Sequence, residues 1–135
     1  MRWVLVFVAG FLAVLCFHQA VFGLLHSAGI IPYVPYAMTP TRPFGVPAVL
    51  SGSFFGGLWA LILVIFLDRV GHGWKWLKAA LFGGIVLTLV ALLIVLPLKG
   101  AGVDLEALPR RFAIGFILNA CWAVGTLVFL RAFGR

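Results

Sequence analysis

Four long apolar runs fill most of this chain of 135 residues, at positions 3–25, 46–67, 77–98 and 112–130. Each run is 19 to 23 residues long, close to the roughly 20 residues that an α-helix needs to cross the hydrocarbon core of a bilayer. Inside lipid, backbone N–H and C=O groups must pair within their own segment, so runs of this length are helices. The sequence therefore predicts an all-α integral membrane protein, a bundle of four transmembrane helices.

The composition supports the same class. Hydrophobic residues make up 64% of the chain and charged residues 10%, whereas soluble domains have about 25% charged residues. The alternation of apolar and polar residues that a transmembrane β-barrel needs is missing. The first run also lacks the small-residue cleavage site of a signal peptide, so we expect it to stay as a helix. We expect one transmembrane domain over residues 1–135, with helices at about 3–27, 46–67, 77–98 and 110–131.

The distribution of Lys and Arg predicts the orientation. Six basic residues would lie on the side of both termini and four on the opposite side. Short loops rich in Lys and Arg stay in the cytoplasm, so we expect both termini there. No basic face is left for nucleic acid, and the lipid bilayer is the expected partner of these charges. The first group is Arg2, Arg69, Lys75, Lys78, Arg131 and Arg135, and the second is Arg42, Lys99, Arg110 and Arg111.

The expected outer loop between the first two helices is rich in proline. Proline fixes φ and removes a backbone donor, so we expect neither helix nor strand in this segment. Two interpretations remain open, a cap over the outer helix ends and a lid or docking loop. The prolines are Pro32, Pro35, Pro40, Pro43 and Pro47.

Small residues recur at helical spacing in three of the runs. They allow helix backbones to approach closely, which matters because lipid supplies no hydrophobic force between helices. Two interpretations remain open, packing within one bundle and a face for self-association. A bundle this small has little interior, so we also expect a homo-oligomer or a subunit of a larger membrane complex. The expected packing residues are Gly52, Gly56, Gly83, Gly84 and Gly115.

Polar residues within the runs fall at one depth. With a rise of about 1.5 Å per residue, they lie roughly 8 to 11 Å below the expected outer boundary. They either form hydrogen bonds between helices or line an outward-facing pocket for a small ligand, a quinone headgroup, an ion or a proton. The residues at this depth are His18, Gln19, Ser51, Ser53 and Asn119, with His26 and Arg42 just above them.

No pattern indicates catalysis or a bound cofactor. His18 and His26 are eight residues apart on one helix and rotated by about 80°, so they cannot bracket one metal ion. Cys16 and Cys121 lack the C-x-x-C spacing of a redox site. The runs contain no acidic residue and no nucleophile with a paired base. We therefore expect no catalytic site, no metal and no cofactor, and an enzyme acting on lipid or quinone ranks last.

Three segments carry a resemblance to known proteins: His18-Gln19, Phe44-Gly45-Val46-Pro47 and Phe55-Gly56-Gly57-Leu58-Trp59. They resemble small four-helix proteins of bacterial inner membranes. The resemblance implies an inner-membrane location and transfers no activity. Two functions are consistent with these observations. The first is an accessory or self-associating membrane component. The alternative is a small carrier or channel with a polar outer pocket around His18, Gln19 and Asn119.

Overall fold

The computed structural model describes residues 1–134, and it is mostly helical. Four helices are long and apolar enough to cross a membrane, as the apolar runs predicted. Their ends lie within three residues of the expected positions. The long helices are Arg2–Ser27, Ala48–Val70, Lys75–Leu98 and Leu108–Ala132.

Two of the long helices are continuous α-helices, and two contain π-helical turns. The continuous ones are the second long helix, α3 (Ala48–Val70), and the fourth, α7 (Leu108–Ala132). The first long helix consists of α1 (Arg2–Ala13), the π-helical η1 (Val14–His18) and α2 (Gln19–Ser27). The third consists of α4 (Lys75–Leu81), η2 (Phe82–Leu87), α5 (Thr88–Val90), η3 (Ala91–Val95) and α6 (Leu96–Leu98).

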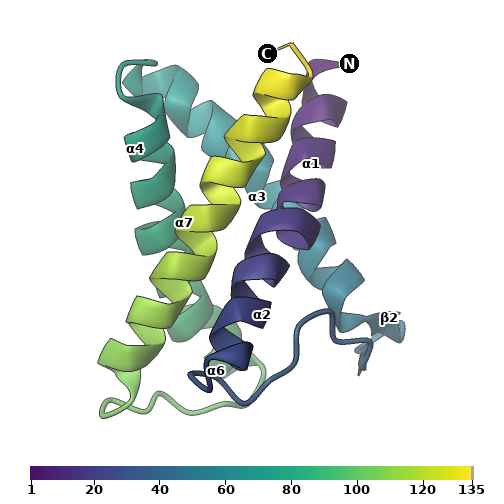
Figure 1. Cartoon of the computed structure of the whole chain (residues 1–135), viewed down its shortest axis with the longest axis vertical. Helices are drawn as coiled ribbons and strands as arrows, with labels where there is room; N and C mark the ends of the chain where they lie inside the picture. The colour runs from purple at the N-terminus through teal and green to yellow at the C-terminus, as the bar shows by residue number, and fades with distance from the viewer. Residues whose placement is uncertain (135) are drawn as a thin grey trace.

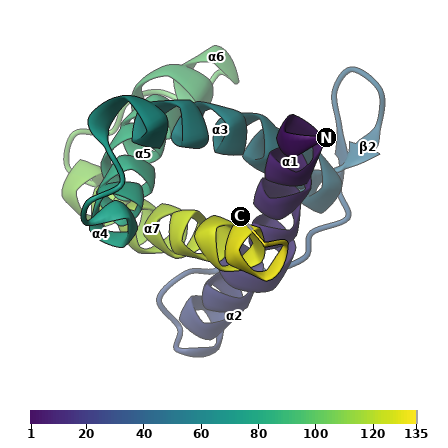
Figure 2. The same cartoon turned by 90° about the horizontal axis from the view of Figure 1, so that it is seen from above.

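The bundle has two distinct ends (Figure 1). The N-terminus, the end of α7 and the turn at 71–74 lie together, and we call this the terminal end. The segments 28–47 and 99–107 lie at the other, the loop end. Seen from above, the long helices surround a common centre (Figure 2). The first long helix packs on α3 and α7, and α7 packs on the third, whereas α3 meets the third mainly at α4, beside the turn.

Two neighbouring helix pairs use the same packing pattern, a phenylalanine ring on a Gly-Gly pair. Phe7 of α1 covers Gly57 of α3, and Phe116 of α7 covers Gly84 of η2. A Cβ added at either glycine would lie 2.6 Å from the ring. The preceding glycine, Gly56 or Gly83, brings the two backbones together in each pair. Both contacts depend on the absence of a side chain, as in close helix crossings generally.

The glycines of the predicted packing motifs divide into two groups. Gly56, Gly83, Gly84 and Gly115 all face another helix of the same chain; a Cβ on Gly115 would lie 2.7 Å from Cγ2 of Thr88. Gly52 differs, because a Cβ there would have no atom of residues 1–134 within 4 Å. Most of the small-residue surface is thus already used inside the bundle.

The proline-rich segment contains a short antiparallel hairpin, so the expectation of no strand is wrong at four residues. Strands β1 (Pro40–Thr41) and β2 (Val46–Pro47) pair Pro40 with Pro47 and Thr41 with Val46. The two prolines occupy the first position of β1 and the last of β2, and strand ends tolerate a missing N–H. The Thr41 hydroxyl also donates to the Val46 carbonyl at 2.7 Å.

The connection before α7 ends in a turn. Oδ1 of Asp104 accepts the N–H groups of Glu106 and Ala107, at 3.1 and 3.3 Å. Pro109 then occupies the first turn of α7, where its missing N–H leaves no hydrogen bond unmade.

A candidate ligand cavity between the long helices

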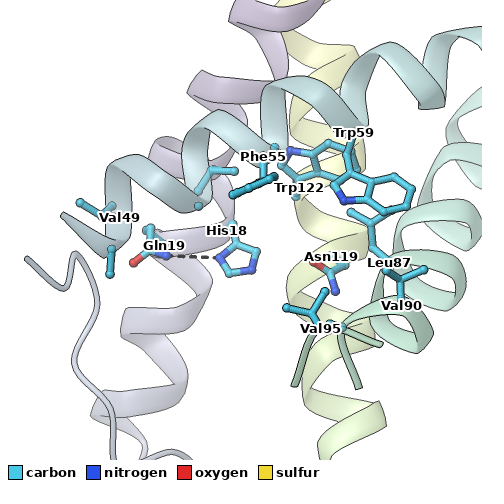
Figure 3. A pocket seen from close by; sticks show the side chains of 15 residues that line it. His18, Gln19, Val49, Phe55, Trp59, Leu87, Val90, Val95, Asn119 and Trp122 are labelled. Carbon is cyan, nitrogen blue, oxygen red and sulfur yellow. Dashed lines mark hydrogen bonds between the residues drawn. The ribbon is translucent and has the colours of Figure 1, made fainter. Parts of the chain in front are cut away.

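A cavity of about 290 Å³ lies where α3 and the third long helix diverge. All four long helices contribute to its wall, which reaches the first residues of α3 at the loop end (Figure 3). The lining residues are Val14, His18, Gln19, Ala48, Val49, Gly52, Phe55, Gly56, Trp59, Leu87, Val90, Ala91, Val95, Asn119 and Trp122.

Three of the predicted polar residues, His18, Gln19 and Asn119, meet in this wall. The amide Nε2 of Gln19 donates to Nδ1 of His18 at 3.4 Å, which leaves the other nitrogen of a neutral imidazole as a donor. The amide Nδ2 of Asn119 donates to the Thr88 hydroxyl at 3.0 Å. Neither the His18 Nε2 nor the Asn119 Oδ1 has a hydrogen-bond partner within residues 1–134. One donor and one acceptor are therefore available to a ligand.

Gln19 also connects the cavity wall to the proline-rich segment. Its Oε1 accepts the backbone N–H of Tyr36 at 2.7 Å, and the Tyr36 hydroxyl donates to the Leu15 carbonyl at 2.6 Å. Tyr36 itself adopts a left-handed backbone with φ 55°, a conformation that is uncommon for a residue other than glycine. No residue of 28–47 lines the cavity. The segment is therefore attached beside the cavity and does not roof it.

Aromatic rings form much of the remaining wall. Phe55 and Trp59 come from α3 and Trp122 from α7, and Figure 3 labels all three among the lining side chains. Trp122 is fully buried, and its Nε1 donates to the Gly10 carbonyl at 3.1 Å. Sequence reasoning did not assign these rings. The available signal was their position in the middle of apolar runs, away from the interfacial belts where tryptophan is usual.

The other predicted site residues lie outside this wall. Ser53 is fully buried, and its hydroxyl donates to the Val49 carbonyl at 2.8 Å within the same helix. Nδ1 of His26 is 3.1 Å from the Ile31 carbonyl at the end of the first long helix. Arg42 is exposed in the hairpin, and Ser51 does not line the cavity. Depth along a helix does not determine the side of the helix on which a residue lies, which is why these residues were grouped with the cavity residues.

The side chains of the cavity wall are suited to binding an uncharged molecule. No Asp, Glu, Lys or Arg lines the cavity. Within residues 1–134, no group of three His, Cys, Asp or Glu side chains could hold a metal ion. An unpaired charge in such surroundings is strongly unfavourable. The polar side chains in the wall can form hydrogen bonds with such a molecule.

A second, smaller cavity of about 120 Å³ lies at the terminal end, and the two cavities share no lining residue. Between the two sets of lining residues along α1, α3 and α7, Ala13, Ala60 and Ala123 are fully buried in the hydrophobic core. The cavity between the long helices is thus closed toward the terminal end by packed side chains.

Comparison with protein-family models, curated proteins and solved structures gives no match for this chain. Its function is therefore interpreted from its own geometry.

Proposed function

We propose that this protein is a multi-pass membrane protein that binds a small, neutral, mostly apolar molecule in the cavity between its long helices. The observation that supports this most directly is the convergence of His18, Gln19 and Asn119 in an otherwise apolar wall. Ligand sites are typically apolar hollows with a few polar groups that fix orientation. At about 290 Å³, the cavity is at the small end of the usual range of about 300 to 1,000 Å³, which favours a single-ring compound with one polar substituent.

Membrane insertion is supported by the two faces of α3. Its outward stripe consists of Phe54, Leu58, Ile62 and Ile65, which are 38% to 49% exposed. Its inward face is small or aliphatic and buried, as at Gly56, Ala60 and Leu63. A contiguous exposed apolar stripe on a helix is unfavourable in water but is the expected surface in lipid. We propose a bacterial inner-membrane location with both termini cytoplasmic, from the Lys and Arg distribution and the resemblance of three segments to inner-membrane proteins.

The proposed orientation predicts which cysteine reporters are labelled in intact cells. In a background with Cys16→Ala and Cys121→Ala, we expect a membrane-impermeant maleimide to label Phe44→Cys, because Phe44 is 88% exposed at the loop end. Gly73→Cys, in the turn at the terminal end, should react only after permeabilisation. A Cβ at Gly73 meets no atom of residues 1–134 within 4 Å, so this reporter should not disturb the turn. The reverse labelling pattern would invert the topology.

Between the two expected functions, the geometry favours the carrier-like alternative, with a binding cavity in place of an open channel. The case for self-association rested on small-residue faces, and Gly56, Gly83, Gly84 and Gly115 are occupied by contacts within the chain. An accessory, homo-oligomeric or complex-forming role stays a prediction without these glycines as support. The packed layer below the cavity supports binding and release at the loop end over free conduction.

Filling the cavity should remove binding without unfolding the protein. Leucine at Gly52 would project into open space in the cavity. We expect saturable binding of 4-fluorophenol, followed by ¹⁹F NMR in detergent, in the wild type and its loss in Gly52→Leu. Gly73→Leu is the matched control, since its side chain is also unopposed but lies in the turn. Equal binding by Gly52→Leu and the wild type would contradict the proposal.

A second probe separates the polar contacts from the apolar ones. 4-Fluorotoluene has the same ring without the hydroxyl, so Asn119→Leu should weaken 4-fluorophenol and spare 4-fluorotoluene. Loss of one hydrogen bond is worth about 0.5–1.5 kcal/mol, which corresponds to about a two- to tenfold weaker affinity. Equal weakening of both probes would indicate a general change in the cavity and not a contact made by Asn119.

A further inference from the structure

The terminal end of the bundle contains the second cavity, and its rim is basic. The cavity measures about 120 Å³ and opens between the ends of α1, α3, α4 and α7. Its floor consists of apolar side chains from the core. Its polar lining is Arg2, Asp68, His72 and Lys75, and its apolar lining is Val6, Val64, Leu67, Leu127 and Leu130.

The single carboxylate in this rim is already engaged. Arg2 forms an ion pair with Oδ2 of Asp68, and Nε2 of His72 lies 3.4 Å from its Oδ1. Lys75 has no acidic partner within residues 1–134. Arg2 uses one of its five N–H donors on Asp68. The rim therefore carries positive charge, on Lys75, that no acidic side chain of residues 1–134 neutralises.

The two ends of the bundle differ in charge balance. Within residues 1–134, Asp68 is the one acidic side chain at the terminal end, against Arg2, Arg69, Lys75, Lys78 and Arg131. Lys78 closes the turn by donating to the Val70 and Gly71 carbonyls, at 3.0 and 3.1 Å, so it is not free to bind elsewhere. At the loop end, Asp104 and Glu106 stand against four basic residues. An anion is thus favoured at the terminal end.

We infer that the cavity at the terminal end binds the phosphate of an anionic phospholipid headgroup. Arg2 and Lys75 would contact the phosphate oxygens, and the apolar floor would take the start of an acyl chain. A free phosphate ion would leave that floor in contact with water, so the mixed lining favours a molecule with both parts. The exposed Trp3 and Trp74 surround this end, and such rings mark the level of lipid headgroups. The inference rests on the proposed membrane insertion but not on the ligand cavity.

Lipid retention measured by native mass spectrometry tests the site. The purified protein in mild detergent is titrated with phosphatidylglycerol, and separately with phosphatidylcholine of the same acyl chains. We expect the wild type to retain phosphatidylglycerol preferentially. Lys75→Gln should lower that retention about fivefold, the effect of one basic residue near an anionic surface. Asp68→Asn, which removes the negative charge from the rim, should raise it.

Lys99→Gln is the matched control, because Lys99 is an exposed lysine at the loop end, and it should leave retention unchanged. Equal retention of the two lipids, or an equal loss in Lys99→Gln, would overturn the site. Inorganic phosphate at millimolar concentration should not displace the lipid. If it does, the cavity takes a free anion and the lipid assignment is wrong. The ¹⁹F probes of the ligand cavity are unaffected by any of these outcomes, so the two proposals can fail separately.

Discussion

Replacing Gly10 by leucine should strongly destabilise the bundle. A Cβ at Gly10 would collide with the Cβ of Ala60 and with the backbone carbonyl of Gly56 on α3. Backbone cannot move aside as a flexible side chain can, so α1 and α3 must separate. Overpacking of a core typically destabilises by about 1–3 kcal/mol, occasionally more, and we expect the upper part of this range or beyond. Unfolding by SDS titration, followed by circular dichroism, measures the loss.

The control for this substitution is Gly73→Leu, which adds the same side chain where no atom of residues 1–134 lies within 4 Å. Its midpoint should stay close to that of the wild type. Gly10→Ala should fall between the two, because one methyl group already reaches the Gly56 carbonyl. Similar midpoints for Gly10→Leu and Gly73→Leu would show that α1 and α3 do not cross where the structure places them.

Trp122→Ala is the second substitution with a large expected effect. The indole is 1% exposed and lies at the junction of α7, α1 and α3, where it also lines the cavity. Truncation of a buried tryptophan or phenylalanine to alanine typically destabilises by about 3–5 kcal/mol, through lost contacts and the hole left behind. We expect an SDS unfolding midpoint well below that of the wild type.

Trp122→Phe separates packing from hydrogen bonding at the same position. It keeps a large ring and removes the donor to the Gly10 carbonyl. That carbonyl also accepts the N–H of Val14, so it is not left unpaired, and the loss should be about 1 kcal/mol. If alanine and phenylalanine destabilise equally, the hydrogen bond and not the packing holds α7 to α1.

The long helices were predictable because one physical requirement defines both their length and their composition. Positions 79–98 hold no charged residue, and Lys75 and Lys78 mark the boundary just before them. The order of helices around the bundle was not predictable in this way. It depends on close contacts such as Phe116 on Gly84, and many residue pairs at similar spacing look equivalent in the sequence.

The sequence predicted the level along the helices at which the candidate site lies. It did not predict toward which side of each helix the residues point. A regular α-helix places His18 and Gln19 about 100° apart, yet both line the same cavity. Between α1 and α2 the chain forms the π-helical η1, a wider turn that a count of 3.6 residues does not describe. Ser53 shows the opposite case, because its level is right but its hydroxyl bonds within α3. Trp59 and Trp122 were missed since apolar rings give no polar signal.

The shared wall of the cavity has a thermodynamic consequence. Since α3 and the third long helix barely touch beyond the turn, a bound molecule would supply contacts between them that the polypeptide lacks. By linkage, a ligand specific for the folded state adds about 2.7 kcal/mol of stability at one hundred times its dissociation constant. The melting temperature of the bundle therefore reports occupancy directly. A collection of compounds can be screened on heat resistance alone, before any reaction or transported solute is known.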